Sequence, residues 1–347
     1  MKITFNSANG QHEVNADGNN SLLVAGLAAG YSLPYACASG TCGTCRARLV
    51  TGTVEDLWPA APGKKCGVGK TDEILLCQCR PQSDCAIEVR ESIHRIPPNT
   101  FTPFEVEATV VKWQLLTHDV ASWEIELNKP MNYEAGQFVL VGIPGIQGYR
   151  AYSIVNFERD SRRLELLIKR RSGGEFSDTL FTSRPIGYPL RVIGPFGRAV
   201  FKPAERKHLL CIAGGSGIAG MMSIISHAES LDYFSDRTGS IFFGVRSMRG
   251  AFFLNRLAEL RNLSSGSLEV IVCFSDEAVP PEAEDQYPEL SFAHGFVHEI
   301  ALTQMMGRLS DVHAFLAGPP PSVDAAMRGL IIQAKLSPKS ISYDKFN

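Results

Sequence analysis

The chain has 347 residues, of which 44% are hydrophobic and 20% are charged, and its formal net charge is −2. This composition excludes a disordered or low-complexity chain, and the balanced charge gives no basic surface for nucleic acid. The apolar runs are shorter than the roughly 18 residues of a membrane span, and no signal peptide pattern opens the sequence. We therefore expect a cytoplasmic protein of two or three domains.

The first segment, residues 1–94, begins with two short stretches of strand character, KITFN and QHEV, separated by the turn dipeptide Asn9-Gly10. A helical stretch follows from Ser21 to Ala29, with Ser21 as its expected N-cap. The segment ends where Pro97 and Pro98 introduce the composition of a linker. We expect a domain over 1–94 and a linker over 95–102.

The second segment, residues 103–203, alternates apolar and polar residues. FEVEATV, WEIEL and LELLIK have the period of half-buried antiparallel strands, and Pro and Gly recur between them. This alternation, with Pro and Gly between the strands, predicts an antiparallel β-barrel.

The third segment, residues 204–347, contains short apolar runs without alternation, which are typical of strands covered on both faces. HLLCIA, SIFFGV, LEVIVCF and HAFLAG are each followed by a helical or loop stretch. This order predicts a parallel α/β sheet, so the whole chain is expected to be multidomain α+β and α/β.

Nine cysteines are present, and seven of them precede residue 86. Without a secretion signal, this usage favours metal ligation over disulfides. Cys37, Cys42 and Cys45 have the spacing C-x4-C-x2-C, and Cys77 follows 32 positions later. This is the ligand pattern of a plant-type [2Fe–2S] cluster.

The loop between these cysteines has the composition that a cluster requires. Gly40 and Gly43 allow tight backbone curvature, and Ser39 and Thr41 offer hydrogen bonds to sulfur. Two alternatives are a zinc site, which usually takes two short cysteine pairs, and a set of buried structural thiols. Cys79 or Cys85 could replace the fourth ligand, whereas Cys66, Cys211 and Cys273 have the character of ordinary thiols.

Two motifs of the barrel segment, RAYS at 150–153 and GGEFS at 173–177, resemble those of the ferredoxin–NADP reductase superfamily. The closer resemblance is to three-domain reductases of bacterial oxygenases, which join a plant-type ferredoxin, an FAD-binding β-barrel and an NAD-binding domain in this order. It covers essentially the whole chain. Taken alone, Arg-x-Tyr-Ser occurs by chance and GGEFS could be a plain helix cap.

The resemblance implies a role for each residue of these motifs. Arg150 would bind the FAD pyrophosphate, as suits a guanidinium. Tyr152 would pack on the isoalloxazine, and the Ser153 hydroxyl would lie near the flavin N5. Lys169 would contact the flavin, and Gly174 and Ser177 would offer donors to a phosphate at a helix start.

The glycine-rich stretch GGSGIAG at 214–220 follows a predicted strand and opens a predicted helix. In this context Gly214, Gly215 and Gly217 allow close approach of a dinucleotide pyrophosphate, although a lone glycine turn is more often structural. The resemblance extends to FFGVR, which ends at Arg246, and to GPPPSVDAA, which begins with Gly318 and Pro319. Ala317 stands where the family commonly has Cys.

The choice of coenzyme is left open by the sequence. NADH-using relatives often have an acid a few residues after FGVR, where it engages the adenosine ribose. Here the stretch is RSMRGAFF, in which Ser247 and Arg249 could accommodate a 2′-phosphate. The family favours NADH, and NADPH is possible.

The C-terminal ISYDKFN resembles the family ending in which a terminal aromatic covers the flavin. Phe346 is the candidate for that cover and Asp344 for a polar role beside N5, with a frayed tail as the alternative. His294 and His298 have a metal-like spacing. Gly295 places His294 in a loop, however, and no third ligand is visible, so we expect ordinary histidines.

These motifs predict an NAD(P)H-dependent electron-transfer flavoprotein. The resemblance implies that it uses NADH, with NADPH possible, and passes electrons through FAD and a [2Fe–2S] cluster to an oxygenase component of the Rieske or diiron type. The alternatives are the same electron chain in deoxysugar biosynthesis and a non-catalytic, zinc-containing nucleotide-binding module. We expect contact with the acceptor to be transient, at an exposed apolar rim formed by Tyr35, Ala36 and Ala38.

Overall fold

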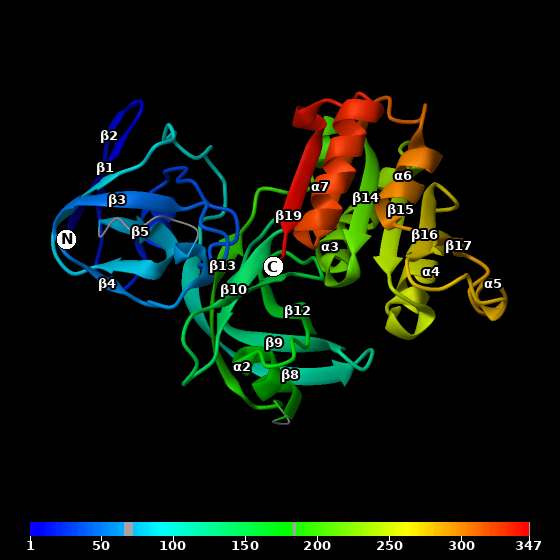
Figure 1. Ribbon diagram of the computed structural model, residues 1–347, viewed down its shortest axis with the longest axis horizontal. Coiled ribbons are helices and arrows are strands. Elements are labelled where there is room, and N and C mark those ends of the chain that lie inside the picture. Colours follow the sequence, from blue (N-terminus) through cyan, green and yellow to red (C-terminus); the bar gives the residue numbers. More distant parts are fainter. Residues whose placement is uncertain (66–71, 183–184, 347) are drawn as a thin grey trace.

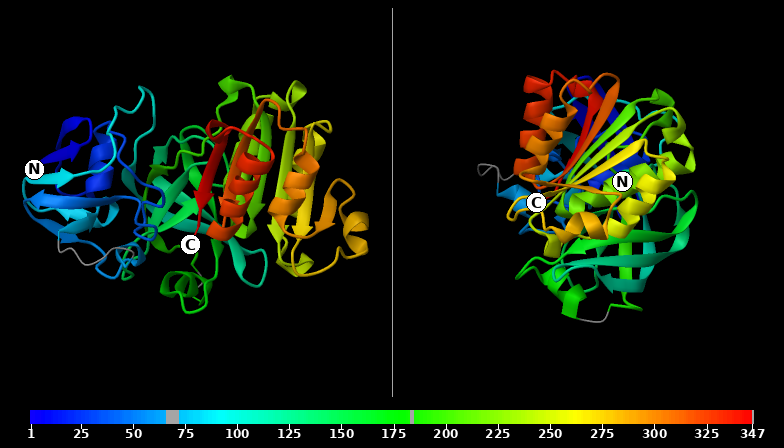
Figure 2. Two further views of the ribbon diagram at one scale, coloured as in Figure 1. Left: turned by 45° about the horizontal axis from the view of Figure 1, so that its top comes forward. Right: turned by 90° about the vertical axis from the view of Figure 1, so that its right-hand side faces the viewer.

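The computed structural model describes residues 1–65, 72–182 and 185–346. Three regions follow one another along the long axis of the molecule, each built on its own β-sheet (Figure 1). The N-terminal region lies at one end, the barrel region in the middle, and the parallel α/β region at the other end (Figure 2). The fold class predicted from the sequence is confirmed.

The N-terminal region is a five-stranded mixed sheet in the order β2-β1-β7-β3-β5, with a two-stranded ribbon of β4 and β6 beside it. The predicted hairpin is present, because β1 and β2 pair antiparallel around the turn at Asn9. Ser21 caps α1 as expected, accepting a hydrogen bond from the Val24 N–H at 3.3 Å. The elements are β1 Lys2–Ser7, β2 Gly10–Asn15, α1 Leu22–Ala28, β3 Arg46–Thr51, β4 Val54–Asp56, β5 Glu73–Leu75, β6 Cys79–Pro81 and β7 Cys85–Glu88.

The middle region is a six-stranded antiparallel sheet in the order β11-β10-β13-β8-β9-β12. An isolated antiparallel bridge between Ile154 and Leu166 joins the segment after β11 to β12, and thus closes the two ends of the sheet toward each other. The elements are β8 Phe104–Leu115, β9 Val120–Met131, β10 Phe138–Gly142, β11 Arg150–Ser153, β12 Ser161–Lys169, α2 Glu175–Thr182 and β13 Pro189–Phe196.

The C-terminal region is a six-stranded sheet in the order β17-β16-β15-β14-β18-β19, in which every neighbouring pair is parallel. The strand order reverses between β14 and β18, so their carboxyl ends form a topological switch point, where ligands of such sheets bind. The elements are β14 His208–Gly214, α3 Ile218–Ser230, β15 Gly239–Val245, α4 Leu254–Leu263, β16 Leu268–Phe274, α5 Glu282–Gln286, β17 Ser291–His294, α6 Val297–Met305, β18 Val312–Gly318, α7 Pro320–Arg328 and β19 Ile341–Lys345.

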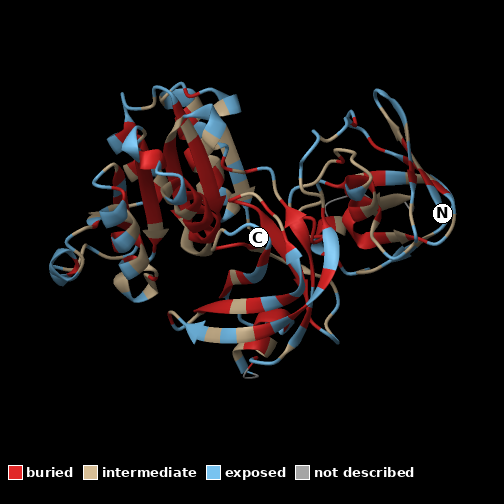
Figure 3. Ribbon diagram, turned by 180° about the vertical axis from the view of Figure 1, so that it is seen from behind, coloured by how far each residue is buried: buried red, intermediate tan, exposed pale blue. Residues whose placement is uncertain are grey.

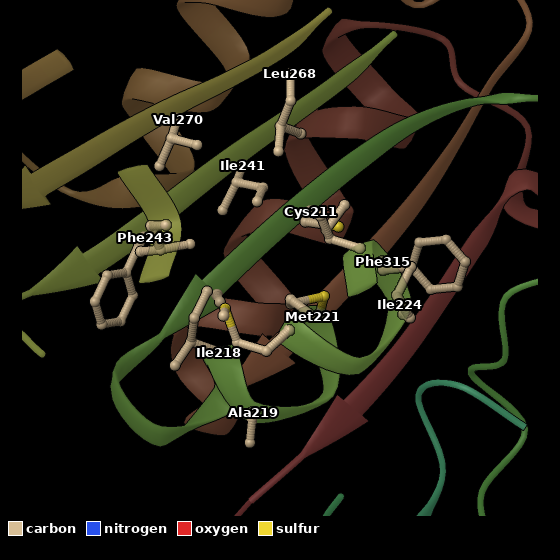
Figure 4. Packing of buried hydrophobic residues seen from close by; sticks show 14 of the residues in the cluster. Cys211, Ile218, Ala219, Met221, Ile224, Ile241, Phe243, Leu268, Val270 and Phe315 are labelled. Carbon is tan, nitrogen blue, oxygen red and sulfur yellow. The ribbon is translucent and has the colours of Figure 1, made fainter. Parts of the chain in front are cut away.

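The parallel strands are buried on both faces, which explains why their sequences lack alternation (Figure 3). Side chains of α3, among them Ile218 and Met221, pack on the sheet against residues of β14 and β15 such as Cys211 and Ile241 (Figure 4). Burial raises the pKa of the Cys211 thiol to about 12, so this cysteine is an inert core residue, as expected.

The three regions share hydrophobic cores across their boundaries. One cluster joins the N-terminal region to Phe138, Leu140, Ile193 and Phe196 of the barrel. A second cluster joins the parallel region to barrel residues that include Phe201. The relative placement of the regions is therefore fixed by burial of apolar surface.

Three further expectations from the sequence concern the linker, the histidines and membrane insertion. The first two residues of the expected linker pair with the N-terminal region: Arg95 forms an antiparallel β-bridge with Tyr31, and the Ile96 N–H donates to the Gly30 carbonyl. His294 ends β17 rather than lying in a loop, and His298 belongs to α6, so the two share no helix face. Within the described ranges, no helix has the length and apolar character that crossing a bilayer requires.

Candidate functional site: a cavity shared by three regions

The cysteine loop between α1 and β3 brings all four predicted ligands to one end of the N-terminal region. The backbone reaches this shape through left-handed residues, with φ of +85° at Gly40 and +76° at Gly43. Gly63 closes over the loop, and its N–H donates to the Gly40 carbonyl at 2.8 Å. A Cβ on Gly63 would lie 2.7 Å from that same oxygen, so only glycine fits there.

The four cysteines are arranged as two pairs. The Cys45 and Cys77 sulfurs are 3.2 Å apart. The Cys37 thiol lies beside that of Cys42, whose hydrogen bond lowers the pKa of Cys37 to about 4. Among the described residues, no three His, Cys, Asp or Glu side chains surround one point closely enough to hold a single metal ion. Two thiol pairs suit a two-iron cluster, in which each iron takes two thiolates.

Hydrogen-bond donors surround these sulfurs. The Thr44 N–H donates to the Cys42 sulfur at 3.5 Å, and the Gln78 amide donates to the Cys77 sulfur at 3.5 Å. The hydroxyls of Thr41 and Ser39 also help to lower the pKa of Cys37. Such donors stabilise thiolate charge and tune a cluster's reduction potential.

A cavity of 620 Å³ lies where the three regions meet. Its wall includes Cys37 of the cysteine loop, Arg150 and Ser153 of the barrel, and Ala219 and Phe346 of the parallel region. Most of the residues predicted for flavin binding are therefore brought to one site. The others on its wall are Ser39, Thr41, Ala151, Tyr152, Leu167, Lys169, Arg171, Ser172, Gly173, Gly174, Glu175, Phe176, Ser177, Ser216 and Lys345.

Arg150 is held between two aromatic rings. Its guanidinium carbon lies 4.5 Å from the ring centre of Trp58, which belongs to the N-terminal region, and 5.6 Å from that of Phe176. Its Nη1 donates to the Tyr149 carbonyl at 3.1 Å. Burial lowers the pKa of Arg150, yet a guanidinium stays charged, so the cavity wall carries a positioned cation.

Tyr152 and Ser153 form the floor of the cavity. The Tyr152 ring packs edge-on against Trp123 at 5.5 Å between ring centres, and burial raises the pKa of its hydroxyl. Ser153 is only 6% exposed, and its hydroxyl lies 3.9 Å from the position that a Cβ on Gly220 of α3 would occupy. The Ser153 hydroxyl is therefore at the boundary between the barrel and the parallel region.

The start of α2 forms another wall. The Ser177 hydroxyl accepts a hydrogen bond from the Arg171 N–H at 3.0 Å and lies 3.2 Å from the Gly174 carbonyl. Ser177 thus fixes the loop that carries Gly174, and the first turn of α2 opens at the cavity. Lys169 is half-exposed on β12, with its Nζ 3.5 Å from an Asp119 carboxylate oxygen.

The glycine-rich turn lies at the switch point of the parallel sheet. Gly214 ends β14, and Gly215 to Gly217 form a 3-10 turn before α3. A Cβ on Gly217 would lie 2.5 Å from the Ala317 carbonyl oxygen, and one on Gly214 would lie 3.3 Å from the Pro319 ring. The structure therefore places Gly318 and Pro319 directly against the glycine turn. Arg246 and Ser247 lie at the end of β15, one strand away.

The C-terminal residues are not a frayed tail. Residues 341–345 form β19, which pairs with β18, and the Phe346 N–H donates to the Gly318 carbonyl at 3.0 Å. Phe346 lines the cavity opposite the barrel motif. Asp344 is not on the cavity wall; it is paired in register with Ala317, and burial raises its pKa to about 7.

The expectation of an exposed rim at Tyr35, Ala36 and Ala38 is wrong. Tyr35 faces the barrel: its hydroxyl accepts from the Gly197 N–H at 3.2 Å, and its ring packs edge-on against Phe196. Ala38 is 2% exposed, and only Ala36 is exposed. The sequence could not show that this side of the cysteine loop is covered by another region.

Comparison with known proteins identifies these regions. Residues 6–82 match the 2Fe-2S iron-sulfur cluster binding domain, residues 107–201 the oxidoreductase FAD-binding domain, and residues 211–328 the oxidoreductase NAD-binding domain. The chain is 34% identical to the ferredoxin–NAD(P)(+) reductase CarAd of Metapseudomonas resinovorans over 93% of each sequence. It belongs to the ferredoxin–NAD(P)(+) reductase family.

Two further relatives agree with this assignment. The ferredoxin–NAD(+) reductase component of the alkene monooxygenase system of Xanthobacter autotrophicus is 32% identical over 94% of this chain and 96% of its own. The solved structure of the ferredoxin reductase in carbazole 1,9a-dioxygenase is 31% identical and superimposes over 100% of this chain and 99% of its own, with a TM-score of 0.82. The predicted family, fold and cofactors, namely FAD, a [2Fe–2S] cluster and NAD(P)H, are thus confirmed.

Some residues of the site were missed by sequence reasoning. Trp58 supports Arg150 from 92 residues away, and nothing in the sequence around it signals this contact. Arg171 and Phe176 adjoin predicted residues, and a helix start next to GG was the available signal for them. Cys66, expected to be an ordinary thiol, lies outside the described residues.

Proposed function

We propose that this reductase is NADH-dependent and delivers single electrons to an oxygenase component of the Rieske or diiron type. The observation that carries the proposal is the shared cavity, because one space is lined by the cysteine loop, the barrel motif and the start of the nucleotide domain. FAD, when bound, supplies the exchange between a two-electron hydride donor and one-electron acceptors.

The chain's own residues hold and orient these groups. Arg150 binds the FAD pyrophosphate, and Lys169, Gly174 and Ser177 complete that wall of the site. Tyr152 and Phe346 enclose the flavin ring from the barrel and the C-terminus. The Ser153 hydroxyl offers a hydrogen bond near N5, at the boundary where the nicotinamide must arrive.

The nucleotide and cluster sites flank this flavin site. Gly214, Gly215 and Gly217 allow the NADH pyrophosphate to approach the backbone, with Gly318 and Pro319 as the opposite wall and Arg246 and Ser247 toward the ribose. Cys37, Cys42, Cys45 and Cys77 hold the cluster. Asp344, on the edge strand β19 beside β18, would hold a proton next to the flavin site without lining its wall.

The acceptor can be tested directly. The holoprotein is reduced with NADH without oxygen and mixed in a stopped-flow instrument with a Rieske-type oxygenase, a diiron hydroxylase component or a deoxysugar-forming iron–sulfur dehydratase. We expect cluster reoxidation by one of the two oxygenases at a rate that saturates with oxygenase concentration. Reoxidation by the dehydratase alone, or by none of the three, would contradict the proposal. The Cys42→Ser variant, which lacks a ligand, is the control.

A further inference from the structure

The turn after β15 has no acidic residue of its own, but an acid from another segment of the chain contacts it. In a β-α-β nucleotide-binding unit, the pyrophosphate lies at the glycine turn and the adenosine ribose lies at the end of the second strand. Here these positions are Gly214 to Gly217 and the residues after Val245. Gly214 and Gly244 are register partners, so both turns leave the sheet at the same edge.

The acid is Glu277, which comes from the turn after the next strand, β16. Its Oε1 accepts a hydrogen bond from the Met248 N–H, at the first residue of the 3-10 turn Met248–Gly250. Ser247 occupies the N-cap position but makes no capping hydrogen bond. The carboxylate thus satisfies one of the free N–H groups at the start of a turn that Ser247 leaves without a capping hydrogen bond.

Glu277 is held there by the backbone. The Ser275 N–H donates to the Val245 carbonyl at 3.1 Å, and the Asp276 N–H donates to the Arg246 carbonyl at 2.9 Å. These bonds continue the pairing of β15 and β16 past the ends of the strands, so residues 275–277 run beside residues 245–248. Glu277 is half-buried, whereas Asp276 is exposed and bonds to its neighbour Ser275 at 2.6 Å.

We propose that Glu277 determines coenzyme choice and selects NADH over NADPH. A carboxylate at this position accepts a hydrogen bond from a ribose 2′-hydroxyl, as the acid of other dinucleotide sites does. A 2′-phosphate would bring two negative charges against it. Arg246 and Arg249 are exposed on the same turn and would attract that phosphate. The charge of Glu277 therefore counteracts the attraction of NADPH by these arginines.

This inference rests on the NADH preference proposed above, and it names the residue behind it. The test uses the oxidised holoprotein and measures the affinities of NAD⁺ and NADP⁺ by titration calorimetry. Glu277→Gln keeps an oxygen that accepts from the Met248 N–H but removes the charge. We expect it to raise NADP⁺ affinity at least about tenfold and to change NAD⁺ affinity less than about threefold.

Two controls separate charge from structure. Asp276→Asn removes a neighbouring charge that does not cap the turn, and should change the NAD⁺ to NADP⁺ affinity ratio by less than about twofold. In the Glu277→Gln background, Arg249→Gln should reverse much of the gain for NADP⁺, and added salt should weaken that gain because exposed charges are screened.

The outcomes are distinct. An affinity ratio that stays within twofold in Glu277→Gln overturns the role of Glu277, and the reductase activity itself remains established. A wild-type protein that binds NADP⁺ more tightly than NAD⁺ overturns the NADH preference as well. The kcat/KM ratio for NADH and NADPH, with ferricyanide as acceptor, should shift in the same direction as the affinity ratio.

Discussion

The two boundaries of the barrel differ in the contacts they make beside the shared cavity, although both bury apolar side chains. Toward the N-terminal region, the Tyr35 ring packs edge-on against Phe196. The Arg198 guanidinium carbon lies 5.2 Å from the centre of the Tyr35 ring, and its Nη2 donates to the Leu33 carbonyl at 2.9 Å. Toward the parallel region, the Arg256 Nη1 donates to both oxygens of the Glu165 carboxylate, at 2.8 and 2.9 Å. Ser153 of the barrel and Phe346 of the parallel region line the same cavity.

This difference follows from what must cross each boundary. Hydride transfer requires the two reacting atoms to come within about 3–3.5 Å, so the nicotinamide must physically enter the space beside the flavin. A single electron needs no such entry, and the N-terminal boundary can be filled with side chains. The Tyr35 contact is therefore compatible with electron transfer, whereas hydride transfer requires the cavity beside Ser153.

The largest effect is expected from replacing a proposed cluster ligand. In Cys77→Ser, we expect electron delivery to a protein acceptor such as cytochrome c to fall at least about 100-fold, because cluster binding requires thiolate ligands. NADH-driven reduction of ferricyanide should persist, since the substitution leaves the barrel and the parallel region unchanged. Iron analysis and both assays check this. Cys85→Ser is the matched control, as Cys85 is similarly buried in the same region but is not one of the four paired cysteines, and it should retain iron.

The boundary between the barrel and the N-terminal region can be loosened at Tyr35. Tyr35→Ala should lower the stability of the N-terminal region by about 2–3 kcal/mol, because a half-buried aromatic ring is removed from a packed site. Tyr35→Phe, which removes only the hydroxyl that accepts from Gly197, should cost about 1 kcal/mol. Loss of the visible cluster spectrum on heating measures both. Equal melting of Tyr35→Ala and wild type would show that Tyr35 is not part of the boundary.

Asp344 on β19 should make the stability of the protein depend on pH. Burial raises the pKa of Asp344 from 3.8 to about 7, so the folded state holds its proton more tightly than the unfolded chain. The stability from this proton is fully present below about pH 4 and is lost as pH rises through 7. Asp344→Asn, which stays neutral, should gain about 1–2 kcal/mol relative to wild type between pH 5 and pH 8.

Denaturant midpoints across this pH range would measure that gain. Glu126→Gln, on the exposed face of the barrel, is the control and should show no such divergence. A gap between Asp344→Asn and wild type that narrows with rising pH would contradict the assignment.

The smallest effect is expected from the ion pair of Arg256 and Glu165, which joins the parallel region to the barrel. Arg256→Ala should cost about 1 kcal/mol, because the arginine is partly exposed even though its Nη1 contacts both Glu165 oxygens. Its clearest consequence should be a rise of about threefold in the KM for NADH, as the parallel region is held less precisely. The exposed pair Lys112 and Glu124, within the barrel, offers a control without this effect.

The sequence predicted best what local spacing encodes. The cysteine loop, the Ser21 cap and the strand-to-helix turn at Gly214 depend on residues close in the chain, and the structure has the thiols in pairs, Ser21 capping α1 and α3 following Gly214. Contacts between regions could not be predicted in this way. Tyr35 resembled an exposed rim residue, Trp58 carried no signal, and Glu277 reaches Met248 only because β15 and β16 are neighbours in the sheet.

The central claim is that electrons pass from NADH through the shared cavity to the cysteine loop. The most direct test is to reduce the holoprotein anaerobically with NADH and to record its low-temperature EPR spectrum. The account predicts the rhombic spin-half signal of a reduced [2Fe–2S] cluster. A bleached flavin with no cluster signal, in a protein that contains its full complement of iron, would contradict it.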